Sequence, residues 1–200
     1  MAHEPASSSS VCFIIAYVIY GYQPQVGASA DALVAFYDGD RTRILIAAVF
    51  SGLAVLNLMW FAAALRTTLA DAGQDGWGAA ATASSAAVGA LFLLLITVGA
   101  ALAYSIAGSG NHTLTSGLND FAWACVVLSS FPRAMLIMSA AFGLWRAGLI
   151  SNALFAAGVA AVVLALAGRH HVAERLDSGH RTAPIRGSSR PSSASCGSWS

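Results

Sequence analysis

The sequence predicts an all-α integral membrane protein: a polytopic transmembrane helix bundle of about five spans, with a short interfacial helix after the first. Of the 200 residues, 57% are hydrophobic and only 10% are charged, whereas soluble domains average about 25% charged residues. Residues 44–65 contain no charged side chain, and about 20 apolar residues in a row are enough for a helix to cross the hydrocarbon core. A soluble protein of this composition would expose large apolar patches to water.

The first predicted span covers residues 8–22 and ends in a cluster of tyrosines, which is typical of a membrane interface. A proline and a glycine follow it and break the helix. Ser29 can then cap a short helix over residues 30–38. Three apolar side chains recur on one face of that helix, so we expect it to lie in the plane of the membrane surface. They are Leu33, Phe36 and Tyr37.

Four further spans are predicted, at residues 44–65, 79–107, 121–145 and 152–168. Small residues dominate the stretch 79–89, and an alanine repeats at every fourth position in the last span. Small residues let membrane helices approach closely, so we expect both stretches to pack against helices of this chain or of another. The repeated residues of the last span are Ala153, Ala157, Ala161 and Ala165.

Residues 169–200 differ sharply in composition from the apolar segments that precede them. They are rich in Arg, Ser, His and Pro, and they bury too little apolar surface to offset the entropy lost on ordering. The sequence therefore predicts a bundle over residues 1–168 followed by a disordered polar tail.

Composition also limits the partners and cofactors. All ten basic residues are arginines and the net charge is +1, which gives no electrostatic reason to expect nucleic acid as a partner. The three cysteines are scattered and predict neither a disulfide framework nor a metal site. No cofactor is expected. The absence of lysine suggests a GC-rich bacterial gene, and we expect a multi-pass protein of the plasma membrane, with the lipid bilayer as its main partner.

Arg133 lies midway between the ends of the fourth predicted span, at residues 121–145. An arginine at a helix centre costs about 2.5–3.5 kcal/mol on insertion scales, so it needs a partner or water. One candidate is the Leu128 carbonyl, which Pro132 displaces. The other is Asn57, at matching depth in a span that runs in the same direction. We interpret these residues either as a polar site at mid-membrane or as a structural charge that is satisfied locally.

Two other patterns leave alternatives open. Asp40 precedes a predicted span that Arg66 ends, and Asp120 and Arg146 repeat this spacing. The helix dipole accounts for both pairs, and a duplicated unit, residues 1–66 and 67–146, is the alternative. Three aspartates in the first loop could bind a divalent cation, although a solvated loop is the simpler interpretation. They are Asp31, Asp38 and Asp40.

Several motifs resemble a group of uncharacterised bacterial multi-pass membrane proteins. They are Ala28–Tyr37, Arg43–Leu45, Trp60–Arg66, Leu118-Asn119-Asp120 and Phe131-Pro132. The resemblance covers about residues 23–168. It implies five or six helices with the first loop outside, and it assigns no activity and no catalytic residue. Arg133 departs from the group's pattern, in which an apolar residue follows Phe-Pro. The group's sixth span is missing, so one hypothesis is that residues 169–200 are translated out of frame.

The function predicted from the sequence is that of a non-enzymatic accessory or structural membrane subunit. The alternative is a small-solute channel or transporter with a polar site at mid-membrane, formed by Arg133, Asn57 and Pro132. An intramembrane enzyme is the third possibility, and it would need a second polar cluster that the sequence does not display. No catalytic, cofactor-binding or metal-binding residue is predicted.

Overall fold

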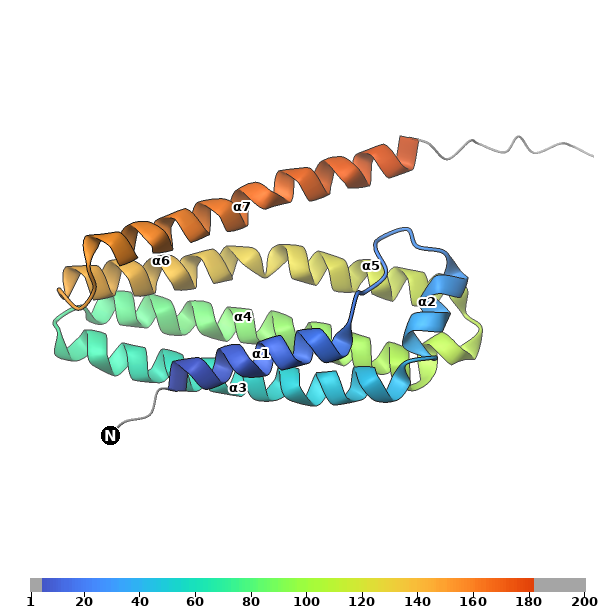
Figure 1. Cartoon of the computed structure of the whole chain (residues 1–200), viewed down its shortest axis with the longest axis horizontal. Coiled ribbons are helices and arrows are strands. Elements are labelled where there is room, and N and C mark those ends of the chain that lie inside the picture. Colours follow the sequence, from blue (N-terminus) through green and yellow to red (C-terminus); the bar gives the residue numbers. More distant parts are fainter. Residues whose placement is uncertain (1–4, 182–200) are drawn as a thin grey trace, which may run out of the picture.

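The computed structural model describes the backbone of residues 5–181, and the side chains of residues 11–164, 166 and 167 except residue 13. Over this range every regular element is a helix, which confirms the predicted all-α fold (Figure 1). A π-helical turn, Leu102–Ile106, and a 3-10 turn, Ala107–Ser109, extend α4. The α-helices are α1 Pro5–Tyr20, α2 Ala30–Tyr37, α3 Arg41–Asp71, α4 Asp75–Ala101, α5 His112–Leu128, α6 Ser130–Arg146 and α7 Asn152–Arg181.

Among the residues that the structure describes, three helical stretches are long and apolar enough to cross a membrane, and they identify the chain as a membrane protein. They are Arg41–Asp71, Asp75–Ser109 and His112–Arg146. The described apolar part of α7, Asn152–Leu164, is shorter, and so is α1. The first and fifth predicted spans therefore stay predictions.

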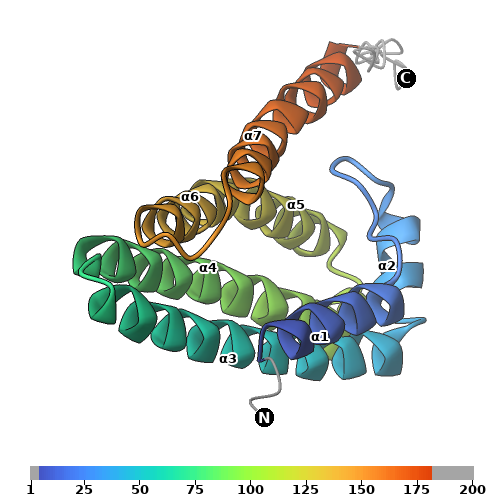
Figure 2. The same ribbon diagram turned by 60° about the vertical axis from the view of Figure 1, so that its left-hand side comes forward.

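The long helices form two layers that meet at α4. Helix α1 packs on α3, α3 packs on α4, and α4 packs on α6. Figures 1 and 2 show α3 and α4 running side by side, with α5 and α6 on the other side of α4. Helix α7 packs on α6 and then leans away from the rest (Figure 2). The short α2 lies across one end of the bundle (Figure 1).

Glycines set the close approach of α3 and α4. A Cβ atom at Gly78 would lie 3.2 Å from the backbone Cα of Arg66, and one at Gly89 would lie 3.3 Å from Cγ1 of Val55. Without side chains at these positions, the two helix backbones can lie close together. The buried residues of the small-residue stretch 79–89 lie on the side of α4 that makes these contacts, as the sequence predicts.

The second, third and fourth predicted spans are longer at both ends in the structure. Helix α3 continues to Asp71, beyond the predicted end at residue 65, and the hydroxyls of Thr67 and Thr68 donate to the Ala64 carbonyl. The connection between the third and fourth predicted spans, residues 108–120, is also shorter in the structure. Gly110 adopts a positive φ of 76°, and the side chain of Asn111 accepts from the Leu114 N–H, so α5 begins at once.

The predicted fourth span is broken into two helices at Ser129. Proline lacks the N–H of an interior helix position, and its ring clashes with the carbonyl four residues earlier. Pro132 sits in the first turn of α6, where no N–H is required, and α5 ends at Leu128, four residues before it. The break thus places Ser129 and Arg133 on the first turn of a new helix near the middle of the stretch His112–Arg146.

Helix α2 begins after Ser29, whose hydroxyl accepts from the Ala32 N–H at 3.4 Å, as the sequence predicts. Its apolar face does not turn toward lipid. Leu33 and Tyr37 are 1% and 0% exposed, in a cluster with Ile44 and Leu102 of the two following helices. Helix α2 therefore covers one end of the bundle.

Helix α7 differs from the prediction in two ways. It continues beyond residue 168 to Arg181, so residues 169–181, expected to be disordered, are helical. No glycine or proline interrupts residues 169–177, and a helix that has already nucleated propagates easily through such a stretch. Residues 182–200 lie outside the described residues. The described alanines of its repeated row, Ala153, Ala157 and Ala161, are exposed and do not pack within the chain.

Candidate functional site

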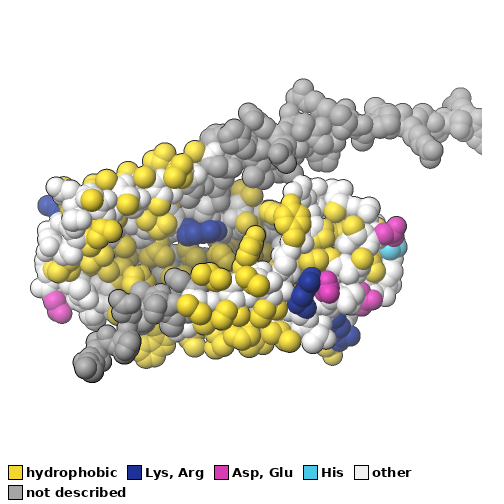
Figure 3. All heavy atoms as spheres, in the orientation of Figure 1, with side chains coloured by type: hydrophobic (Ala, Val, Ile, Leu, Met, Phe, Trp, Pro, Cys, Tyr) yellow, Lys and Arg dark blue, Asp and Glu magenta, His cyan; other side chains and the backbone are white. Residues whose placement is uncertain are grey.

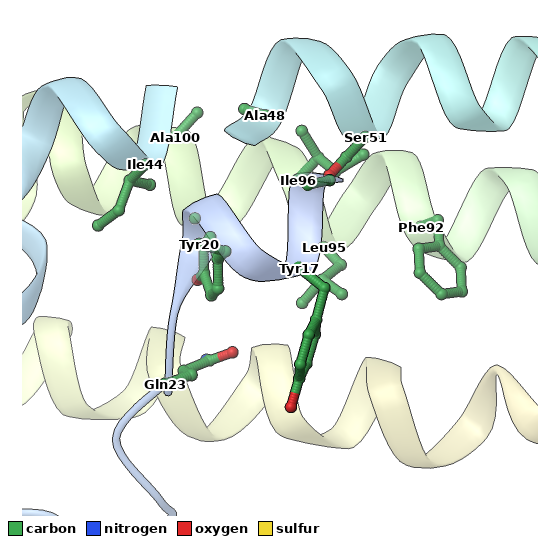
Figure 4. A pocket seen from close by; sticks show the side chains of 12 residues that line it. Tyr17, Tyr20, Gln23, Ile44, Ala48, Ser51, Phe92, Leu95, Ile96 and Ala100 are labelled. Carbon is green, nitrogen blue, oxygen red and sulfur yellow. The ribbon is translucent and has the colours of Figure 1, made fainter. Parts of the chain in front are cut away.

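A cavity of about 160 Å³ lies between α1, α3 and α4. Its walls are mostly apolar, and it runs along α4 from Phe92 to Ala100 (Figure 4). Eight residues of helix at 1.5 Å per residue make this about 12 Å long. The lining residues are Ala16, Tyr17, Tyr20, Gln23, Ile44, Ala48, Ser51, Phe92, Leu95, Ile96, Gly99 and Ala100. We call it the α1–α3–α4 cavity.

A buried hydrogen-bond network closes one end of the α1–α3–α4 cavity. Gln23, which lines the cavity, donates from Nε2 to the Tyr37 hydroxyl at 3.1 Å and to Asn119 Oδ1 at 3.2 Å. The Tyr37 hydroxyl donates to the same Asn119 oxygen at 2.9 Å. The indole Nε1 of Trp123 donates to the Pro24 carbonyl at 2.9 Å. Helix α5 thereby holds the segment after α1 in place, and with it the wall formed by Gln23.

The network is neutral. Burial, and to a smaller extent the neighbouring Tyr20, raise the pKa of the Tyr37 hydroxyl well above its ordinary value of 10. The phenol therefore stays protonated at neutral pH and can keep donating to Asn119. Asn119 is 1% exposed, and its amide nitrogen is buried without a partner in the structure. This end of the cavity offers hydrogen-bonding groups but no charge.

The opposite end of the cavity adjoins a cation. Phe92 lines the cavity, and the guanidinium carbon of Arg133 lies 5.5 Å from the centroid of its ring. Nη2 of Arg133 donates to the Ser129 hydroxyl at 2.7 Å, and that hydroxyl donates to the Val126 carbonyl. Arg133 is exposed. Figure 3 shows a hollow on this face, walled by apolar side chains, with a basic side chain inside it.

The structure separates the residues that the sequence placed together. Asn57 lies on α3, and α4 lies between α3 and α6, whose few contacts include that of Leu69 with Gly143. The hydrogen bond expected between Asn57 and Arg133 is therefore not formed. Arg133 bonds to the Ser129 hydroxyl instead of the Leu128 carbonyl. Pro132 does contribute to the surroundings of Arg133. It ends α5 and so places Ser129 one turn before the guanidinium.

Sequence reasoning missed the residues at the other end of the cavity. Tyr20 and Gln23 appeared only as part of an interface and a connection, and Asn119 only as part of a family-like motif. The available signal was an uncharged amide within two residues of the end of each of two predicted spans, Gln23 after residues 8–22 and Asn119 before residues 121–145. Amides there stay buried only if they find partners, but the sequence does not show that they find each other across 96 positions.

The other sequence-based candidates separate in the fold. No cluster of three metal-binding side chains occurs among the residues that the structure describes. In the first loop, Asp40 pairs with Arg43 at 2.6 Å. Asp120 lies inside α5 instead of before a helix, so its resemblance to Asp40 in the proposed duplication is lost.

Comparison with protein-family models, with curated proteins and with solved structures finds no match to this chain. The functional argument therefore depends on the cavity and on the residues around it.

Proposed function

We propose that this chain is a non-enzymatic multi-pass protein of the bacterial plasma membrane that binds a small apolar molecule in the α1–α3–α4 cavity. The observation that supports this most directly is the cavity itself, with about 160 Å³ and mostly apolar walls. An apolar cavity of about 150 Å³ is large enough to hold a benzene-sized ligand. The sequence-based alternative was a small-solute channel or transporter with a polar site at mid-membrane. The present proposal differs from it, because it assigns binding of an apolar molecule to the cavity that Phe92 lines.

The chemistry of the walls supports binding more than catalysis. Among the described residues that line the cavity there is no His, Cys, Asp or Glu. Nucleophilic or acid–base catalysis needs a reactive group with a base within hydrogen-bonding reach. Tyr20, Gln23 and Ser51 offer only neutral hydrogen-bonding groups there, which suit the orientation of a ligand.

Filling the cavity tests this proposal. We expect Ala48→Phe to weaken binding of octanol, measured by equilibrium binding to protein in lipid nanodiscs, by at least about tenfold, equivalent to about 1.4 kcal/mol. The added ring would occupy the space that Ala48 borders in Figure 4. Ala63→Phe is the matched control, because Ala63 is exposed on the same helix and does not line the cavity.

Two results would contradict the proposal. One is octanol binding no stronger than that of nanodiscs without protein. The other is unchanged binding by Ala48→Phe when the variant unfolds at the temperature of the unmodified protein, since a filled cavity cannot hold the ligand.

An accessory subunit, the leading prediction from the sequence, is the second candidate. It is favoured by α7, which packs on α6 through Phe155 and Gly158 while Ala153, Ala157 and Ala161 are exposed. Such a row suits close packing with a helix of a second copy. We expect Ala157→Leu to lower the oligomeric state measured by sedimentation in detergent. An unchanged state would count against this candidate and leave the cavity proposal intact.

A further inference from the structure

We propose that the ligand of the α1–α3–α4 cavity is an alcohol, a small neutral amphiphile whose hydroxyl group donates a hydrogen bond to Oε1 of Gln23. This inference rests on the proposed function and names the chemical class of the ligand. Its starting point is the side-chain amide of Gln23, which lines the cavity and also belongs to the network that closes it. The nitrogen and the oxygen of this amide have different surroundings.

The hydrogen bonds of Gln23 leave its oxygen open. An amide nitrogen carries two N–H donors, and Nε2 donates to the Tyr37 hydroxyl and to Asn119 Oδ1. Neither partner lines the cavity, so the nitrogen points out of it, and the oxygen on the other side of the planar amide faces the cavity (Figure 4). Within the described part of the chain, no group donates to this oxygen. Oε1 can therefore accept from a ligand.

The surroundings of Oε1 favour a neutral hydroxyl over a charged head. The polar side chains among the described lining residues are Tyr17, Tyr20, Gln23 and Ser51, and all four are neutral at neutral pH. A protonated amine or a carboxylate would leave water there without a counter-charge, which costs far more than burying a hydroxyl that forms hydrogen bonds. An alcohol supplies the donor that Oε1 lacks and carries no charge.

The Gln23 end of the cavity lies toward the membrane surface. Nη2 of Arg43 lies 3.5 Å from the position of a Cβ at Gly21, two residues before Gln23, and Arg43 is paired with Asp40. Charged groups are costly in the hydrocarbon core and are tolerated at its edge. From this end the cavity runs inward along α4 to Phe92. An amphiphile held by Gln23 thus keeps its bilayer orientation, with the hydroxyl toward the surface and the chain toward the core.

The size of the cavity suits one short chain. Its volume of about 160 Å³ is close to that of apolar cavities that hold a benzene-sized ligand. Along α4 it spans about 12 Å at 1.5 Å per residue, from Phe92 to Ala100. The Tyr20 hydroxyl lies 3.5 Å from the position of a Cβ at Gly99, so the glycine leaves room for the ring at this end. The chain therefore lies along α4, with its head beside Tyr20 and Gln23.

The experiment compares two isomers that differ in one hydrogen-bond donor. 1-Octanol and heptyl methyl ether contain the same atoms and both accept hydrogen bonds, but only the alcohol donates one. Equilibrium binding is measured to the protein in nanodiscs of zwitterionic lipid, and each affinity is expressed relative to partitioning of the probe into nanodiscs without protein. We expect the unmodified protein to bind octanol at least about fivefold more tightly than the ether, because the ether leaves Oε1 without a donor.

Gln23→Met tests the residue itself, because it replaces the amide by an apolar group of similar length. We expect octanol affinity to fall to that of the ether, while ether binding changes by less than about twofold. Gln25→Met is the matched control. Gln25 is an exposed glutamine of the same segment that does not line the cavity, so this variant should keep the preference for octanol. Ala48→Phe should weaken both probes.

The results separate this inference from the proposed function. Equal binding of the two isomers by the unmodified protein overturns the hydroxyl inference and leaves the apolar site standing, and this comparison depends on no variant. A Gln23→Met variant that keeps the preference for octanol also overturns it, because another group, such as Ser51, then accepts the bond. An equal loss of both probes in that variant shows that Gln23 only shapes the wall, and it overturns the inference too. Failure of both probes to bind the unmodified protein overturns both proposals.

Discussion

Asn119→Ala is expected to lower the free energy of unfolding by about 2–3 kcal/mol, because it leaves buried hydrogen-bonding groups without their partner. Asn119 Oδ1 accepts from the hydroxyl of Tyr37, which is 0% exposed, and from Nε2 of Gln23. Little water reaches these groups to replace the lost bonds. The measurement is denaturant unfolding in detergent, followed by tryptophan fluorescence, to which Trp123 on the same helix contributes.

Asn57→Ala makes the same chemical change at a half-buried position of α3. The structure shows no hydrogen bond of the Asn57 side chain to any other described residue, so we expect a change within about 0.5 kcal/mol. A double-mutant cycle with Tyr37→Phe should give less than additive losses, because the two residues share one network. Equal losses for Asn119→Ala and Asn57→Ala would contradict the network as a source of stability.

Gly78→Val should lower the free energy of unfolding by about 1–3 kcal/mol more than the same change at Gly76, because it overpacks a helix contact. A Cβ at Gly78 would lie 3.2 Å from both the Cα and the carbonyl oxygen of Arg66, and these backbone atoms cannot rotate away. Nothing lies within 4 Å of the corresponding position at Gly76. Thermal unfolding of the two variants in the same detergent measures the difference.

The pair is matched because both glycines lie in the first turn of α4, two residues apart. Both substitutions carry a similar change in helix propensity, which the comparison removes. A smaller difference than about 0.5 kcal/mol would mean that α3 and α4 can separate at this end without loss. That result would argue against glycine as the reason for their close approach.

Helix content could be predicted because membrane helices are specified locally. The length of an apolar run identifies each long helix. A capping residue such as Ser29 identifies the start of a shorter one. The predicted ends of the helices were less accurate than their positions in the chain. Threonines at 67 and 68 look like a polar connection in the sequence, but their hydroxyls bond to the preceding turn and the helix continues. Such bonds form only once the helix exists.

The neighbours of each helix could not be predicted in the same way. Sequence spacing gives the depth of a residue in the membrane, and it placed Asn57 and Arg133 at similar levels. It does not say which helix lies beside which. Because α4 separates α3 from α6, a pair that matches in depth is not a pair in contact.

The sequence by itself determined that this is an all-α membrane protein, where its apolar helices lie, and that Arg133 sits deep within one of them. These features follow from composition and from 1.5 Å of rise per residue, both of which are local. Only the tertiary structure decided that Arg133 adjoins a cavity through Phe92, and that Gln23, Tyr37 and Asn119 close its other end. Those contacts join segments far apart in the chain, and the order in which helices pack creates them.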